Sequence, residues 1–115
     1  TEDALAKVEN WLSTGKHIDT IVSMNDGMAI GAMQAVNSAG MTGEIKIYGS
    51  DAVDQAVAAV KNGEMTGTVY FDVQDEGAAG IDTLYKVCMG ETVEKQVLMP
   101  PTLVTAENVN ELFPD

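Results

Sequence analysis

Polar residues follow three short β-branched runs of the sequence, and each group precedes a helical pattern. The groups are Asn25-Asp26 after the first run, Ser50-Asp51 after the second, and Phe71-Asp72 with Gln74 after the third. An amide both donates and accepts hydrogen bonds, whereas a carboxylate only accepts, and its planar group can accept from two neighbouring hydroxyls at once. This mixture of groups suits a neutral ligand rich in hydroxyls, such as a sugar or polyol.

Side chains of the same types also cap helices, so a structural interpretation stays open. Each position offers a candidate cap for the helix that follows: Asn25 or Asp26, then Asp51, then Asp72 or Gln74. Phe71 likewise fits either a core aromatic or a ring that lies against the apolar face of a sugar. Polar positions gathered at one edge of a sheet favour a binding site over a set of independent caps.

The elements that must position these residues alternate between helical and strand patterns. Apolar residues recur at helical spacing in residues 3–14, 27–39, 52–62 and 76–89, and strand-like runs occupy residues 18–24, 44–48 and 66–71. This alternation predicts an α/β fold with a parallel sheet flanked by helices. In such a sheet, residues just past the carboxyl ends of the strands converge on one edge, where ligands bind.

Weaker patterns complete the chain. Pro100 and Pro101 lack backbone amide donors, so residues 96–105 are predicted to form an edge strand or an extended crossing. Residues 106–113 are predicted to add a short helix that Pro114 ends. Cys88 lies on the apolar side of the last long helical pattern and is predicted to belong to the core.

Composition and charge argue against several classes of function. The 115 residues suit one small domain, and a net charge of −12, with six lysines and no arginine, repels nucleic acid and anionic lipid surfaces. Phosphorylated or acidic ligands would need a cation, and none stands within the strand-end groups. No apolar run is long enough to span a membrane, and the first residues lack the features of a signal peptide.

Catalysis and metal binding have little support from the residue types. The lone His17 and the single Cys88 leave no zinc cluster, no internal disulfide and no nucleophile with a base beside it. A metal at Asp51, Asp54 and Asp72 would require a clustering that the spacing does not indicate. The sequence also fits an aspartyl-phosphate receiver domain poorly, because it lacks a lysine after the last strand. We therefore expect no enzyme activity, no metal and no cofactor.

Several segments resemble one protein family. Residues 23–35, Ser-Met-Asn-Asp-Gly-Met-Ala-Ile-Gly-Ala-Met-Gln-Ala, are similar to the signature of periplasmic sugar-binding proteins of the ribose and galactose type. Residues 46–51, 59–63, 66–69 and 103–109 are similar to further segments of that family. The resemblance implies a partial C-terminal lobe of a type I periplasmic binding protein.

Such a protein would bind a monosaccharide or polyol as the solute receptor of an ABC-type importer. It would work with a membrane permease at the periplasmic or extracellular face of the cell envelope.

The resemblance also implies which residues bind the sugar. Asn25 and Asp51 match two residues of the C-terminal lobe that hydrogen-bond sugar hydroxyls in this family. The third such residue is Gln or Asn in the family, whereas Phe71 stands at that position here. Either Gln74 takes over that role, or Phe71 reshapes the pocket for a different sugar or polyol.

The resemblance also predicts how the chain is divided between the two lobes of such a protein. Residues 1–71 would belong to the sugar-binding C-terminal lobe. Residues 72–97 would form a hinge crossing and a helix that packs on an N-terminal lobe outside this sequence, and residues 98–115 a return crossing and tail. Without the other lobe, we expect the chain to bind sugar weakly or not at all. We also expect it to self-associate through the exposed apolar stripe of that helix.

A rival interpretation is the effector-binding domain of a lactose-repressor-type transcription regulator, which shares this fold. The acidic composition without arginine and the closing residues 104–108 argue against it. The sequence preceding Thr1 would distinguish a secretory signal from a helix-turn-helix.

Overall fold

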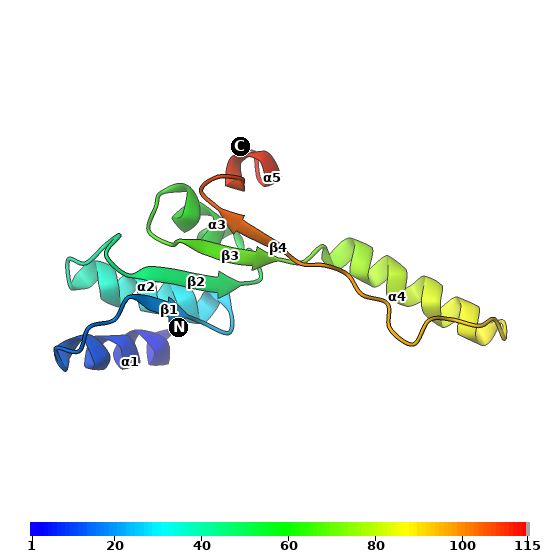
Figure 1. The fold of residues 1–115 in the computed structure, drawn as a ribbon, viewed down its shortest axis with the longest axis horizontal. Coiled ribbons are helices and arrows are strands. Elements are labelled where there is room, and N and C mark those ends of the chain that lie inside the picture. The colour runs from blue at the N-terminus through cyan, green and yellow to red at the C-terminus, as the bar shows by residue number, and fades with distance from the viewer. Residues whose placement is uncertain (115) are drawn as a thin grey trace. The chain divides into compact units, whose positions relative to one another are not determined.

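Helices and strands alternate in the computed structural model, which describes residues 1–114 (Figure 1). The helices are α1 (Glu2–Ser13), α2 (Asp26–Ser38), α3 (Asp54–Lys61), α4 (Val73–Cys88) and α5 (Val109–Leu112). The strands are β1 (Thr20–Val22), β2 (Lys46–Ser50), β3 (Gly67–Tyr70) and β4 (Thr102–Thr105). Each of the predicted helices and strands corresponds to one of these elements, although only the last part of residues 96–105 forms a strand.

The chain forms two compact units. Unit 1 comprises Thr1–Tyr70 and the segment from Leu103 onward, and unit 2 comprises Phe71–Thr102. Unit 1 therefore contains the sheet with α1, α2, α3 and α5, whereas unit 2 contains α4 and the extended segment that follows it.

The strands form one sheet in the order β1-β2-β3-β4. β1 and β2 are parallel, with Ile21 opposite Ile47, and β2 and β3 are parallel, with Gly49 opposite Thr68. β4 lies at the edge beside β3 and runs in the opposite direction (Figure 1). The predicted α/β fold is thus confirmed, with β1, β2 and β3 parallel and helices flanking the sheet. The segment after Pro101 takes the edge position expected of it.

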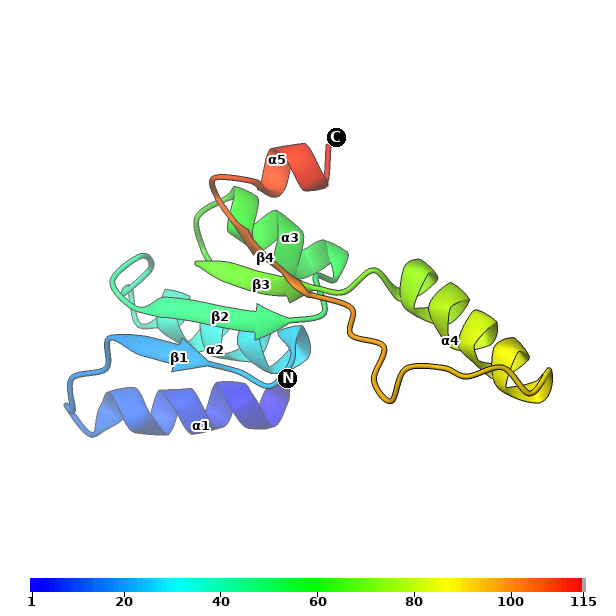
Figure 2. The same cartoon turned by 45° about the vertical axis from the view of Figure 1, so that its right-hand side comes forward.

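The core of unit 1 lies between the sheet and the helices. α2 packs against β1 and β2, α3 packs against α2 and β3, and α1 packs against α2. Figure 2 shows α1 running alongside β1 and α2 behind β2. The apolar residues that recur at helical spacing in α2 are buried, namely Ala29, Ala32, Met33 and Val36. This packing holds the carboxyl ends of the strands and the start of α2 in place.

Unit 2 leaves the apolar side of α4 uncovered. Within the described residues no side chain of α4 is buried, and Ile81, Leu84 and Tyr85 are 71%, 64% and 63% exposed. Cys88 is also exposed, so the prediction that it lies in the core is wrong. Helical spacing shows which side chains share a face, but unit 2 has no element that covers this face. None of the helices in residues 1–114 combines the length and apolar character needed to cross a bilayer.

Candidate functional site

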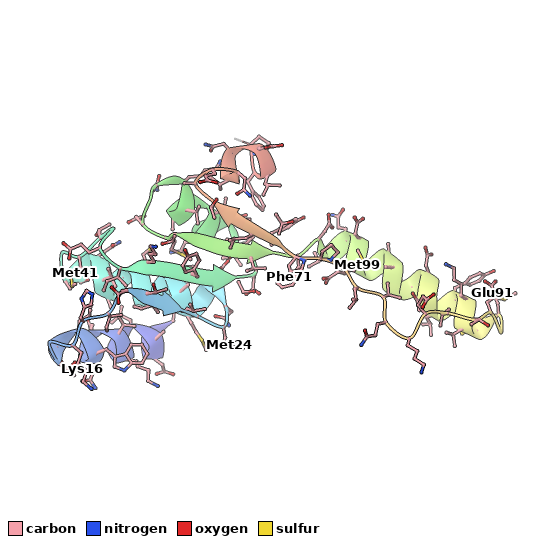
Figure 3. The ribbon with its side chains drawn as sticks, in the orientation of Figure 1. Lys16, Met24, Met41, Phe71, Glu91 and Met99 are labelled. Carbon is pink, nitrogen blue, oxygen red and sulfur yellow. The ribbon has the colours of Figure 1, made fainter. Side chains whose placement is uncertain are left out.

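Asn25 and Asp51 lie at the same edge of the sheet. β1 and β2 are parallel and end at Val22 and Ser50, so the segments that follow them begin at one edge. Asn25 lies between β1 and α2, Asp51 directly follows β2, and both side chains are exposed. Figure 3 labels Met24, the chain neighbour of Asn25, at this edge. The structure therefore brings these two predicted site residues together.

Asn25 caps helix α2. Its Oδ1 accepts a hydrogen bond from the Met28 backbone amide at 2.9 Å, so the structural interpretation holds for this residue. The bond also orients the side-chain amide, because Oδ1 must face the helix. In residues 1–114 the Nδ2 group donates to no protein atom, which leaves it as a hydrogen-bond donor at the sheet edge. Capping and ligand binding are thus compatible roles for Asn25.

Asp51 caps no helix. Helix α3 begins at Asp54, and its N-cap residue is Val53. The carboxylate of Asp51 accepts no hydrogen bond from the described part of the chain. Both of its oxygens are therefore available to hydroxyl donors at the edge where Asn25 offers an amide donor.

Asp26 is the site residue whose role the sequence did not show. Its side chain is fully buried, and Oδ1 accepts from the Thr68 hydroxyl at 2.6 Å, while Oδ2 accepts from the Val53 amide at 2.9 Å. The Thr68 hydroxyl in turn accepts from the Ala52 amide at 3.2 Å. Asp26 therefore links the start of α2 to β3 and to the turn that carries Asp51.

Opposing influences act on the acidity of this carboxyl group. Burial raises the pKa of Asp26, and the nearby negative charge of Asp51 raises it further. Hydrogen bonds from the Thr68 hydroxyl and from the Val53 and Ala52 amides act to lower the pKa. Burial dominates, so the carboxyl of Asp26 gives up its proton less readily than an exposed aspartate.

A signal for this arrangement is present in the sequence at Gly49. The sequence pattern ends the strand at residue 48, but β2 runs to Ser50, so Gly49 lies within the strand. A glycine within a strand indicates a close approach of another group to the backbone. A Cβ atom at Gly49 would lie 2.1 Å from Oδ1 of Asp26, so this carboxylate occupies the space that a side chain would need. The glycine thus marks the place on β2 where Asp26 packs.

Phe71 and Gln74 belong to unit 2 rather than to unit 1. Phe71 lies between β3 and α4 and is half-buried, and Figure 3 labels its side chain there. Asp72 caps α4, because its Oδ1 accepts from the Gln74 and Asp75 backbone amides, each at 3.1 Å. The Gln74 side chain is exposed and is not the cap. A shared role of Phe71 or Gln74 with Asn25 and Asp51 stays a prediction.

Ionisable groups elsewhere form no further cluster in the described residues. No group of three or more His, Cys, Asp or Glu side chains within residues 1–114 is arranged to hold a metal ion. His17 Nε2 pairs with Asp19 at 2.7 Å, and both side chains are exposed. The site at the strand ends thus consists of amide and carboxylate groups.

A family model described as "Periplasmic binding protein domain" matches residues 1–92. The chain belongs to this family. The parallel strands, the sheet-edge position of Asn25 and Asp51, and the resemblance of residues 23–35 all agree with that membership. The resemblance to periplasmic sugar-binding proteins is therefore confirmed at the level of the family.

Relatives of this periplasmic binding protein domain include proteins named for the small molecules that they bind. A putative rhizopine-binding protein of Rhizobium meliloti is 42% identical over 103 residues, which are 89% of this chain and 33% of the relative. A xylitol-binding protein of Mycolicibacterium smegmatis is 34% identical over 110 residues, which are 95% of this chain and 31% of the relative. The chain thus spans about a third of the length of the curated relatives it matches.

Solved structures of periplasmic binding proteins share the fold. An ABC transporter solute-binding protein from Bacillus halodurans with bound myo-inositol superposes with a TM-score of 0.84 at 36% identity. The match covers 96% of this chain and 38% of that protein. These relatives give no support to the lactose-repressor-type alternative.

Proposed function

We propose that this chain binds a monosaccharide or polyol as part of the solute receptor of an ABC-type sugar importer. The proposal rests on one observation: an amide donor on Asn25 and a carboxylate on Asp51 lie at one sheet edge, and neither has a hydrogen-bond partner within residues 1–114. Family membership and the ligands named for the relatives support it. Receptor function further implies a membrane permease as partner and a place at the periplasmic or extracellular face of the cell envelope.

The chemistry of the edge favours a neutral ligand. The Asp51 carboxylate accepts hydrogen bonds from hydroxyls, and the Asn25 amide donates to a hydroxyl oxygen. Residues 23–26 and 50–53 contain no lysine or arginine, so an anionic ligand would meet only the negative charges of Asp51 and Asp26. A sugar or polyol satisfies the donor and the acceptors without adding charge.

A second lobe would complete the site in this proposal. Residues 1–71 form part of one lobe. Residues 72–97 cross to the second lobe, on which α4 packs, and residues 98–115 cross back to the first lobe and form the tail. The exposed apolar side of α4 supports such a contact, since an uncovered apolar helix face marks a packing surface. Phe71 and Gln74 stand at the start of the crossing, where Gln74 supplies an amide or Phe71 an aromatic surface.

Titration of the 115-residue chain with a panel of pentoses, hexoses and polyols tests the function. An incomplete site would bind weakly or not at all, and the exposed Asn25 donor and Asp51 acceptors favour weak binding. We therefore expect a sugar or polyol to shift the NMR signals of the Asn25 and Asp51 amides, with a Kd of about 1 mM or weaker. A phosphorylated sugar serves as the matched control and should shift these signals less. No response to any neutral compound would contradict the function, and micromolar binding would contradict the need for a second lobe.

Self-association of the chain is a second expected result. Leu84 lies in the exposed apolar stripe of α4, and pairing of two copies would remove that stripe from water. Sedimentation velocity at rising protein concentration should show dimers or larger species, and Leu84→Lys should shift the chain to monomer. The control Asp75→Asn makes the same change in net charge away from the stripe and should leave association intact. A monomeric wild type at high concentration would contradict this prediction.

A further inference from the structure

The turn after β2 has an unusual backbone. Asp51 has a φ of 117° and Ala52 a φ of 52°, and within residues 1–114 no other non-glycine residue has a positive φ. This region is unfavourable for residues with a Cβ atom and persists where surrounding contacts enforce it. The turn that carries the Asp51 carboxylate therefore needs an anchor.

Each backbone amide of the turn has its own acceptor. The bonds run from Asp51 N to Val69 O at 2.8 Å, from Ala52 N to Thr68 Oγ1 at 3.2 Å, and from Val53 N to Asp26 Oδ2 at 2.9 Å. The first of these bonds joins the turn to the backbone of β3. The other two bonds end on side chains, so substitutions at positions 26 and 68 can remove them.

The two side-chain acceptors are joined to each other. The Thr68 hydroxyl donates to Oδ1 of Asp26 at 2.6 Å, and both side chains are 0% exposed. They are the buried polar side chains of the described residues. Burying a carboxylate is unfavourable unless its oxygens are hydrogen-bonded. Both oxygens of Asp26 accept here, and its position at the start of α2 and beside the start of α3 adds a favourable helix-dipole interaction.

An asparagine would not replace this carboxylate. Oδ1 and Oδ2 of Asp26 both face donors, so an amide NH2 would meet either the Val53 amide or the Thr68 hydroxyl with a second donor. The hydroxyl of Thr68 is equally specific, because it donates to Asp26 and accepts from Ala52 at the same time. The arrangement thus depends on an acceptor-only group at position 26 and a hydroxyl at position 68.

We propose that Asp26 and Thr68 are a positioning pair, which holds the turn so that the Asp51 carboxylate is presented to the ligand. The inference rests on the proposed function, in which Asp51 contacts a sugar or polyol. Asp26 also follows Asn25 in the chain, so the same anchored carboxylate sets the spacing between the two ligand-binding side chains. A turn held in advance lowers the ordering cost of binding.

Amide hydrogen exchange in the 115-residue chain tests the anchoring without any ligand. Thr68→Val removes the hydroxyl, and we expect exchange at the Ala52 and Val53 amides to accelerate at least tenfold relative to the Ile47 amide in the centre of the sheet. Thr68→Ser keeps the hydroxyl and should restore slow exchange. Asp26→Asn should accelerate the same amides, and Thr68→Val keeps the test decisive should Asp26→Asn fail to fold. Changes no larger than at Ile47 would overturn the inference, since they would reflect only a general loss of stability.

A second measurement connects the anchor to binding. Titrations use myo-inositol and xylitol as probes and follow the Asn25 amide signal. We expect at least tenfold weaker binding in Thr68→Val and recovery in Thr68→Ser. Unchanged binding in a variant whose turn exchanges rapidly would overturn the inference. Failure of the wild type to bind either probe would count against the proposed function instead, and the exchange rates alone would then decide the anchoring.

Discussion

Replacing Gly49 by alanine is expected to lower the free energy of unfolding by about 2–4 kcal/mol, from overpacking and from disturbed buried hydrogen bonds. The added Cβ atom would lie 2.1 Å from Oδ1 of Asp26 and 3.0 Å from the Cβ atom of Ala29. Asp26 has no solvent-exposed space to move into and holds Thr68 and Val53 through its oxygens. Relief of the collision must therefore break one of these bonds or push α2 away from the sheet.

Urea unfolding followed by circular dichroism measures this effect. The matched control is Gly27→Ala in the first turn of α2, where the new Cβ atom would meet Asn25 Oδ1 at 3.5 Å and Thr1 Oγ1 at 3.7 Å, both ordinary contact distances. Its stability should be unchanged or slightly raised, because alanine is the better helix former. Equal unfolding midpoints for the two variants would show that Gly49 does not face a rigid carboxylate.

Asp51→Asn is expected to weaken sugar or polyol binding at least tenfold. A hydrogen bond to a charged group contributes about 1.5–3 kcal/mol, and the neutral amide also replaces one acceptor oxygen with a donor. Asparagine tolerates positive φ better than most residues, so the backbone of the turn should survive the substitution. The loss would therefore report on the carboxylate rather than on the fold.

The NMR titration described above measures the affinity. Asp54→Asn is the matched control, since Asp54 is an exposed carboxylate in the first turn of α3 and the change in charge is the same. It should bind as the wild type does. Equal affinities for Asp51→Asn and the wild type would remove Asp51 from the binding site.

Much of the fold follows from local patterns in the sequence. Apolar residues at helical spacing, such as Ala29, Ala32 and Met33, indicate α2, and β-branched runs indicate β1 and β3. Alternation of these patterns predicts parallel strands, and parallel strands place Asn25 and Asp51 at one edge. The helices and strands depend on residues close together in the chain, and their regular alternation restricts the sheet to parallel strands, which is why sequence reasoning reaches both.

The division of roles between Asn25 and Asp26 did not follow from such patterns. Either residue fits a helix cap by type and position, and the structure shows that Asn25 caps α2 while Asp26 turns inward. The partner of Asp26 is Thr68, which lies 42 residues further along the chain. No pattern within one segment specifies a contact at that separation.

Residue type and periodicity were therefore sufficient to predict the α/β class and the gathering of an amide and a carboxylate past the strand ends. Only the tertiary structure decided the burial of Asp26, its bond to Thr68, the lack of space for a side chain at Gly49 and the exposure of Cys88. Those features arise where segments distant in sequence meet or fail to meet. Their energetics depend on what occupies the adjoining space, which no single segment encodes.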